Sequence, residues 1–177
     1  MMSHLYNNTT NYDTLVKKIY FTGILKKIIK VGDLVSKNKT ILDFGCGIGK
    51  LKDLLINSNK NVINYDIVKE FSEVSYWNEK YFNVLVANEV FYTFEESELR
   101  ELLQKLRKFN PELTLLVGIS KQTIINKIGS FIFNDSKSHL GTKISPKKEI
   151  KILLEYTKLL RKTSKYFLVD IYLLKFK

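Results

Sequence analysis

Apolar residues recur along the chain in two alternating patterns, one typical of amphipathic helices and the other of buried strands. From residue 12 to residue 36 they recur at helical spacing with lysines between them, which predicts an N-terminal helix. Short and almost wholly apolar runs predict buried strands, and these runs lie at residues 40–44, 62–66, 82–87 and 113–119. Helices are predicted between them at residues 50–57 and 93–109, the second opened by a capping box from Thr93 to Glu96.

The last third of the chain has a different pattern. A helix is predicted from Ser145 to about Tyr156, because a serine cap followed by proline favours a helix start. Residues 157–163 and 166–175 then predict two strands, and the tight turn between them at residues 164–165 requires them to be antiparallel. Since strands and helices alternate before this hairpin, we expect a doubly wound, mostly parallel, Rossmann-like α/β sheet with helices on both faces.

Length and composition predict one soluble domain. At 177 residues the chain can bury a sizeable core, and its 45% of hydrophobic and 27% of charged residues are ordinary for a globular protein. Cys46 is the only cysteine, which excludes an internal disulfide and fits a reducing compartment. No apolar run approaches the roughly 20 residues that span a bilayer, and residues 1–15 are too polar for a signal peptide. We therefore expect a cytoplasmic protein without a membrane span.

The positive charge is concentrated near the C-terminus. The net charge is +11; residues 1–118 carry 16 basic and 14 acidic residues, whereas residues 119–177 carry 13 and 4. A basic face attracts nucleic acid, anionic lipid or an anionic small molecule. The alternative is a compositional bias, because arginine, the better residue for phosphate recognition, is scarce among the many lysines.

The segment most informative about chemistry is the loop after the first strand, with glycines at positions 45, 47 and 49. Lys50 stands where the dinucleotide fingerprint needs its third glycine, and Leu51 cannot ligate the magnesium ion of a Walker loop. What remains is an acid, Asp43, two residues before the first glycine. Its carboxylate repels phosphate and suits a cationic ligand such as S-adenosylmethionine, which carries an ammonium and a sulfonium group.

The segment Asp43-Phe44-Gly45-Cys46-Gly47-Ile48-Gly49 resembles motif I of the class I S-adenosylmethionine-dependent methyltransferases. The order of strands and helices is similar to that family from residue 12 to the C-terminus. The resemblance implies a seven-stranded sheet, S-adenosylmethionine as the cofactor, and ribose hydroxyls that donate to an acid at the end of the second strand. The stretch from Phe82 to Tyr92 is similar to the family's motif IV strand and exit. The implied cofactor-binding residues are Asp43, Gly45, Cys46, Gly47, Gly49, Asp66, Asn88, Glu89 and Val90.

Two features depart from this family. Only residues 67–81 are available for a helix and a third strand, so we expect a reduced third strand and no full helix, which leaves the adenine contact open. Thr93 stands where many small-molecule methyltransferases carry a histidine, so the usual general base is missing there. Within a single domain over residues 1–177, we assign residues 37–118 to the cofactor-binding half and residues 119–177 to a basic, substrate-side half.

The catalytic candidate is a histidine. Methyl transfer from a sulfonium depends on positioning, and it needs a base only where the acceptor must lose a proton. His139, which follows the strand at 113–119, is the candidate base, and the alternative is a solvated loop histidine. Phe91 either walls the transfer site or belongs to the core. With two histidines, one cysteine and no zinc-binding spacing, we expect no metal site.

Three hypotheses for the function remain. The first is a methyltransferase acting on an oxygen or nitrogen of a small molecule, and the lysines between residues 121 and 144 would favour an anionic acceptor. The second is a methyltransferase of RNA or protein that uses the basic residues 119–177 as a docking surface. The third is a non-catalytic partner protein that kept the fold. The first is favoured over a nucleic-acid substrate, and the oligomeric state is left open.

Overall fold

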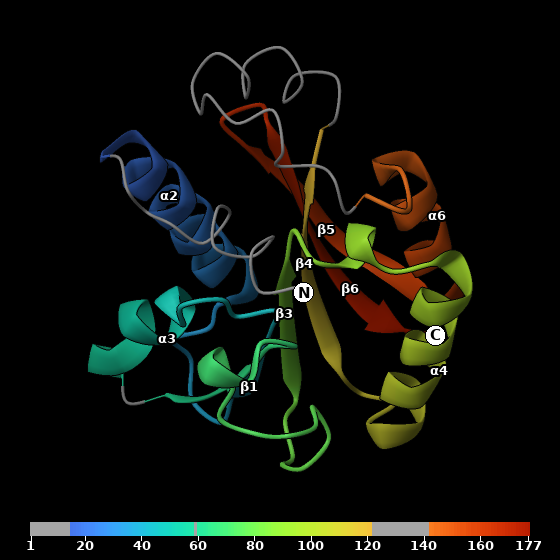
Figure 1. Cartoon of the computed structure of the whole chain (residues 1–177), viewed down its shortest axis with the longest axis horizontal. Helices are drawn as coiled ribbons and strands as arrows, with labels where there is room; N and C mark the ends of the chain where they lie inside the picture. Colours follow the sequence, from blue (N-terminus) through green and yellow to red (C-terminus); the bar gives the residue numbers. More distant parts are fainter. Residues whose placement is uncertain (1–14, 59, 122–141) are drawn as a thin grey trace.

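Four parallel strands end at the same edge of one mixed sheet (Figure 1). The computed structural model describes residues 15–58, 60–121 and 142–177, and within them the sheet has six strands in the order β2-β1-β3-β4-β6-β5. The parallel strands are β1 (Thr40–Phe44), β2 (Asn61–Tyr65), β3 (Val84–Asn88) and β4 (Thr114–Ser120). The last two strands are β6 (Val169–Phe176), antiparallel to β4, and β5 (Thr157–Lys165), antiparallel to β6. The structure thus has the predicted mixed α/β architecture with a C-terminal hairpin.

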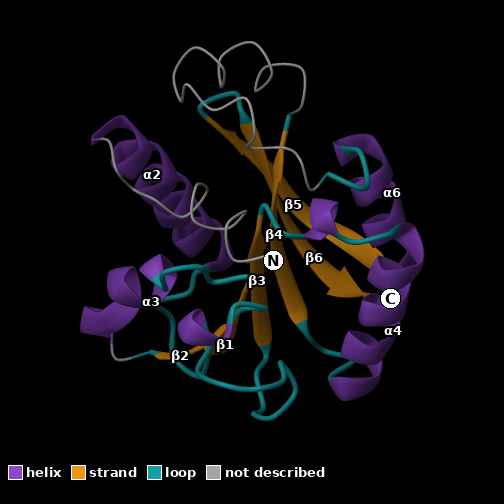
Figure 2. Ribbon diagram, viewed as in Figure 1, coloured by secondary structure: helices purple, strands orange, loops and turns teal. Residues whose placement is uncertain are grey.

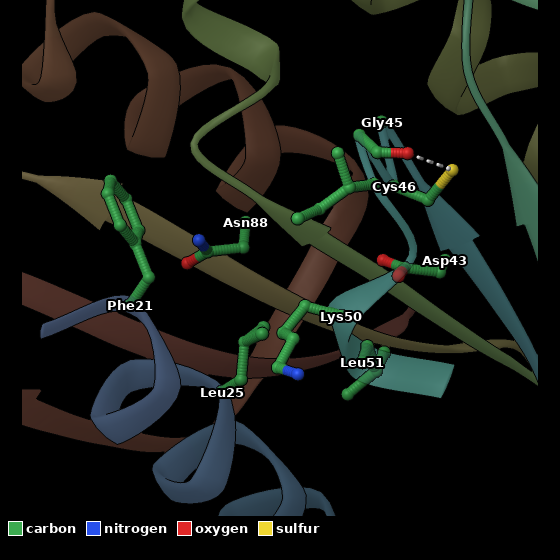
Figure 3. A pocket seen from close by; sticks show the side chains of 10 residues that line it. Phe21, Leu25, Asp43, Gly45, Cys46, Lys50, Leu51 and Asn88 are labelled. Carbon is green, nitrogen blue, oxygen red and sulfur yellow. Dashed lines mark hydrogen bonds between the residues drawn. The ribbon is translucent and has the colours of Figure 1, made fainter. Parts of the chain in front are cut away.

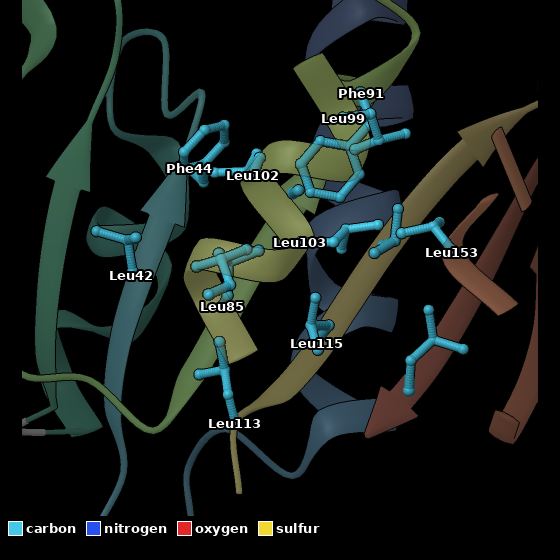
Figure 4. Close-up of a cluster of buried hydrophobic side chains, with 14 of the residues drawn as sticks. Leu42, Phe44, Leu85, Phe91, Leu99, Leu102, Leu103, Leu113, Leu115 and Leu153 are labelled. Atoms are coloured by element: carbon cyan, nitrogen blue, oxygen red, sulfur yellow. The ribbon is translucent and has the colours of Figure 1, made fainter. Parts of the chain in front are cut away.

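Helices cover both faces of the sheet (Figure 2). One face carries α2 (Leu15–Gly32) and α3 (Lys50–Leu55), and the other carries α4 (Glu96–Phe109) and α6 (Pro146–Tyr156). Each face buries its own apolar cluster. Ile41 of β1 belongs to the cluster under α2 and α3, whereas its neighbour Leu42 belongs to the cluster under α4 and α6 (Figure 4). Because successive side chains of a strand point to opposite faces, a sheet covered on both faces needs strands that are apolar throughout.

The seven-stranded sheet expected from the resemblance is not confirmed. Residues 67–81 contain a 3-10 turn, η2 (Lys69–Phe71), and no strand, so β2 is the last strand on that side. On the outer edge of β2, the backbone groups of Asn64 are paired by Glu73 instead of by a strand. The backbone N–H of Glu73 donates to the carbonyl of Asn64 at 2.9 Å, and the Glu73 carboxylate accepts from the Asn64 N–H at 3.2 Å. An ion pair with Lys52 of α3 holds Glu73 in this place.

One helix ends earlier and another begins later than predicted. The N-terminal helix was predicted to reach residue 36, but α2 ends at Gly32, and Asp33 has a left-handed φ of 48° that cannot continue a helix. The predicted capping box from Thr93 to Glu96 is wrong. Thr93 lies in a 3-10 turn, η3 (Phe91–Thr93), and α4 begins at Glu96 with the Glu98 carboxylate accepting from the Glu95 N–H at 2.7 Å.

The turn of the C-terminal hairpin lies two residues later than predicted. Residues 164–165 are paired in β5, and the chain reverses at Tyr166 and Phe167, whose φ angles are 55° and 58°. The turn packs against α2. The Tyr166 hydroxyl lies where a Cβ on Gly23 would be, so Gly23, a poor helix former, makes room for this contact.

Candidate active site

The glycine loop turns the chain sharply between β1 and α3. The N–H groups of Gly45 and Cys46 both donate to the carbonyl of Tyr65, at 2.8 and 3.1 Å, which ties the loop to the end of β2. Gly45 has a φ of 76°, and a Cβ there would lie 2.5 Å from a methyl carbon of Val90. Both the backbone angle and the close approach of Val90 therefore require glycine at this position.

Asp66 holds the middle of the same loop. Its carboxylate is only 7% exposed and accepts from the N–H of Gly47 at 2.9 Å through one oxygen. The other oxygen accepts from the N–H of Val68, also at 2.9 Å. Each carboxylate oxygen has a further lone pair, so the group can accept more hydrogen bonds without breaking these two.

Asp43 faces a pocket beside the loop. The side chain is 6% exposed and lines a cavity of about 120 Å³, and no described residue donates a hydrogen bond to its carboxylate. Burial and, second, the charge of Asp66 raise the pKa of Asp43 to about 7. A buried carboxylate without a partner favours a bound cation.

Asn88 lies across the pocket from the loop, at the end of β3 (Figure 3). Its side-chain oxygen is buried and has no hydrogen-bond partner among the described residues. Gly118 of β4 packs so closely against that oxygen that a Cβ there would overlap it. The remaining side of the pocket is apolar and is formed by Phe21 and Leu25 of α2. The pocket thus combines an unpaired carboxylate, an unpaired amide oxygen and an apolar wall.

Comparison with solved structures finds several chains of the same fold. The PH0226 protein from Pyrococcus horikoshii OT3 superposes with a TM-score of 0.70 at 14% identity, covering 96% of this chain and 94% of that one. Magnesium protoporphyrin IX methyltransferase from Synechocystis PCC 6803, with bound S-adenosylhomocysteine, gives 0.57 at 14% identity and covers 98% and 92%. The methyltransferase domain of bacterial CtHen1-C gives 0.62 at 16% identity and covers 89% and 98%. The chain has the class I methyltransferase fold. Protein-family models and curated proteins, compared by sequence, give no match.

The methyltransferase fold brings five of the predicted site residues into one pocket. Asp43, Gly45, Cys46, Gly47 and Asn88 line it, whereas Gly49, Asp66, Glu89 and Val90 do not. Gly49, with a φ of 74°, caps α3.

Cys46 lies within the glycine loop, and its side chain is partly buried. Its Sγ donates toward the carbonyls of Phe71 and Gly47 at 3.3 and 3.4 Å. Burial, followed by the charges of Asp43 and Asp66, raises the pKa of the Cys46 thiol well above its usual range.

Glu89 follows β3 in a strained conformation. Its φ is 57°, its N–H donates to the carbonyl of Gly118 at 2.9 Å, and its carboxylate accepts from the Ser120 hydroxyl at 2.5 Å. Burial raises the pKa of Glu89, and the Ser120 hydrogen bond opposes that rise. Strain of this kind is held by surrounding contacts and is common at functional sites.

Two other predicted residues have different outcomes. Phe91 is fully buried and packs 6.0 Å from Phe44 between ring centres, so it belongs to the core of the methyltransferase fold and is not a wall of the transfer site. His139, the predicted base, lies outside the described residues.

Some residues that the structure places where the parallel strands end were not indicated as site residues by the sequence. Phe21 and Leu25 belong to the apolar stripe of α2, and their spacing indicated only a buried helix face. Glu149, in the first turn of α6, was not singled out from the sequence, yet it is almost fully buried. In the described part of the chain no cluster of three or more potential ligands could hold a metal ion, and no helix has both the length and the apolarity to cross a membrane.

Proposed function

We propose that this protein binds S-adenosylmethionine and transfers its methyl group to a small-molecule acceptor. The observation that carries the proposal is the arrangement of Asp43, Asp66 and Asn88 around the glycine loop, at the edge where the parallel strands end. Ligands of open α/β sheets bind outside the carboxyl ends of the strands. The relative from Synechocystis, which has the same fold, holds S-adenosylhomocysteine, and this supports the proposal.

The described residues fit this cofactor. The spare lone pairs of the Asp66 carboxylate would accept from the ribose hydroxyls. The unpartnered oxygens of Asp43 and Asn88 would accept from the ammonium group of the methionine part. Ile67, next to Asp66, is 73% exposed and offers an apolar surface for the adenine, although residues 67–81 form no third strand.

The protein's own contribution would be to orient and to exclude water. When bound, the cofactor supplies an electrophilic methyl group on a sulfonium sulfur. The apolar side chains of Phe21 and Leu25 keep water from one side of the pocket, and the tethered glycine loop fixes the other. Positioning of this kind can supply much of the acceleration of a displacement reaction.

Calorimetric titration of the full chain with S-adenosylmethionine tests the proposal. We expect binding to the wild type and binding weakened by about tenfold or more in Asp66→Asn, because a hydrogen bond to a charged group contributes roughly 1.5–3 kcal/mol. Asp33→Asn is the matched control, since Asp33 is exposed and asparagine also tolerates its positive φ. Thermal unfolding of each variant checks that the fold is kept.

Two results would contradict the proposal. If the wild type does not bind the cofactor, the protein is a non-catalytic member of the fold. If Asp66→Asn binds as tightly as the wild type, the cofactor does not use the site proposed here. Release of S-adenosylhomocysteine in the presence of candidate acceptors then measures the transfer itself.

A polymeric acceptor is the second candidate, and one surface favours it. The edge strand β5 is exposed from residue 158 to residue 162 and carries Lys158, Arg161 and Lys162. Phe167, in the adjacent turn, is 82% exposed and offers a ring on which a base could stack. RNA binding that weakens steeply as salt is raised, and that is lost in Arg161→Ala, would favour this candidate over a small molecule.

A further inference from the structure

Besides Asp43, a second buried carboxylate receives no hydrogen bond from the described residues, and it lies on the face of the sheet that α4 and α6 cover. Glu149, in the first turn of α6, is 2% exposed, and no described residue donates a hydrogen bond or forms an ion pair with it. Two lysines close to Glu149 in the sequence pair with the start of α4 instead: Lys143 with Glu95 at 3.4 Å and Lys148 with Glu96 at 2.9 Å. A buried carboxylate without a partner destabilises a fold, so its presence calls for an explanation.

Glu149 lies beside Glu89. The segment that precedes α6 is fastened to the segment that follows Glu89, because the N–H groups of Lys143 and Ile144 donate to the carbonyl of Tyr92 at 2.9 and 3.3 Å. Burial and, second, the charge of Glu89 raise the pKa of Glu149 to about 8. The backbone therefore holds the carboxylate of Glu89, which follows β3, close to that of Glu149 in the first turn of α6.

Among the described residues, the lysines named here are engaged with other carboxylates. Ser120 donates to Glu89, but the next residue, Lys121, pairs with Asp170 at 3.0 Å. From α2, Tyr20 faces Glu89 closely enough that the Glu89 charge, after burial, raises the pKa of its hydroxyl. The Tyr20 ring itself is stacked on Tyr166, with 5.7 Å between the ring centres, so the two carboxylates, and not the ring, would recognise an ammonium group here.

The pair adjoins the cofactor pocket. Asn88 lines that pocket, and Glu89 is the next residue along the chain, so the two carboxylates lie directly beyond the end of β3. An acceptor must approach the methyl group from outside the cofactor, and this is a place from which it can do so. The carboxylates disfavour the anionic acceptor that the lysines of residues 121–144 suggested.

We propose that Glu89 and Glu149 form the acceptor-binding end of the site, and that the acceptor is an amine that enters as an ammonium ion between them. This inference rests on the proposed methyltransferase function. The ammonium gives one proton to a carboxylate and becomes a neutral amine. Its nitrogen lone pair then forms the bond to the methyl carbon, while the electron pair of the broken carbon–sulfur bond stays on sulfur. The product is a methylammonium ion with a neutral thioether, and the proton on the carboxylate passes to water.

Matched amines and alcohols test the charge preference. The full chain, saturated with S-adenosylhomocysteine, is titrated with benzylamine, tyramine and putrescine, and with benzyl alcohol as the neutral counterpart, by NMR and calorimetry. We expect at least one amine to bind and benzyl alcohol to bind more weakly. In Glu149→Gln and Glu89→Gln, amine binding should weaken by about tenfold or more, because one partner of a buried charge pair is lost. Glu101→Gln is the control, since Glu101 is exposed on α4 and paired with Lys105.

Each result supports or overturns the inference. Glu149→Gln removes a buried charge and keeps the shape, so it should fold at least as stably as the wild type. The inference fails if no amine is preferred over benzyl alcohol, if magnesium chloride shifts the same resonances and amines do not, or if Glu149→Gln weakens S-adenosylhomocysteine binding as strongly as amine binding. Failure of the wild type to bind S-adenosylhomocysteine or S-adenosylmethionine at all contradicts the methyltransferase function itself. That failure is separate, because cofactor affinity is measured before any amine is added.

Discussion

The carboxylate of Asp43 lies beside that of Asp66, and both are almost completely buried. Asp43 stands at the penultimate position of β1, and Asp66 immediately follows β2, its parallel neighbour. Asp66 receives two backbone hydrogen bonds, whereas no described residue donates one to Asp43. The two groups therefore differ: backbone donors hold the Asp66 carboxylate, whereas Asp43, whose pKa is raised, takes up a proton more readily when no cation is near.

This division predicts that stability falls as pH rises. The pKa of Asp43 in the folded protein is about 7, well above the value near 4 expected in the unfolded chain. The folded state thus binds the proton more tightly, so the contribution of Asp43 to stability is full below about pH 4 and is lost by about pH 7. In Asp43→Asn the fall in the free energy of unfolding between pH 5 and pH 8 should be smaller than in the wild type, since only the part due to Glu149 remains, and urea unfolding at the two pH values measures this. An equal pH dependence in wild type and Asp43→Asn would contradict the assignment.

The contact between Gly45 and Val90 predicts a measurable coupling. Gly45→Ala should destabilise the protein by roughly 2–4 kcal/mol, because a left-handed φ costs about 1–2 kcal/mol and the new methyl group overlaps Val90. Val90→Ala removes the overlap but not the backbone strain, so the double variant should recover only part of the loss. A double-mutant cycle by urea unfolding checks this, and additive effects would show that the overlap is relieved elsewhere.

Asp170 of β6 predicts a loss of stability in acid. Its carboxylate pairs with Lys121 and Lys162, each at 3.0 Å, and accepts from the Ser164 hydroxyl at 2.5 Å. Burial alone would raise the pKa of Asp170, but the hydrogen bonds from Ser164 and the lysines outweigh it and lower the pKa. The stabilisation is therefore present above the unfolded pKa near 4 and is lost as pH falls through the lower folded value.

Asp170→Asn should reduce the free energy of unfolding at pH 7 by about 1–3 kcal/mol. Its stability should then fall less steeply than that of the wild type below pH 4. Chemical unfolding at pH 3 and pH 7 measures both effects, and Glu101→Gln, which changes an exposed ion pair, should show neither. A variant as stable as the wild type at pH 7 would mean that the lysines find other partners.

The contact between α2 and the hairpin turn predicts that glycine is preferred over alanine at position 23, the reverse of the usual order in a helix. Alanine normally stabilises a helix by about 1 kcal/mol relative to glycine. Gly23→Ala should instead destabilise, because the added methyl group overlaps the Tyr166 hydroxyl. In a Tyr166→Gly background the overlap is gone and glycine suits the φ of 55°, so Gly23→Ala should there become stabilising. Thermal unfolding of the four proteins decides whether the sign reverses.

The parallel part of the fold could be predicted because each buried strand is apolar on both faces and is followed by a helical pattern. The strand at Thr40–Phe44 and the glycine turn after it were located to the residue for this reason. The shortness of residues 67–81 predicted a reduced third strand and no full helix, but that no strand at all forms there could not be predicted, because the capping of β2 depends on how Glu73 meets Asn64 and Lys52 in space. The turn at Tyr166 was misplaced because neither Tyr166 nor Phe167 favours a positive φ by itself, and packing on α2 selects that conformation.

The candidate site likewise contains residues that the sequence could place and one that it could not. Asp43 and Asp66 are local to recognisable loops, so their placement followed from the strand ends. Glu149 is distant in sequence from both, and a glutamate near a serine-capped helix start is ordinary in sequence terms. Only the three-dimensional arrangement shows that this side chain lies near Glu89 and receives no hydrogen bond or ion pair from the described residues.

The backbone and side chain of Glu73 also protect the exposed edge of the sheet at β2. A sheet that ends early leaves a row of open hydrogen-bonding groups, which can recruit the margin of another molecule and start aggregation. Glu73 occupies both groups of Asn64 on that margin and adds a charge there, so a second copy cannot continue the ladder past this point. At the opposite margin the lysines and arginine of β5 repel a like-charged copy. The six strands of the described residues thus end on both sides in margins that disfavour edge-to-edge pairing.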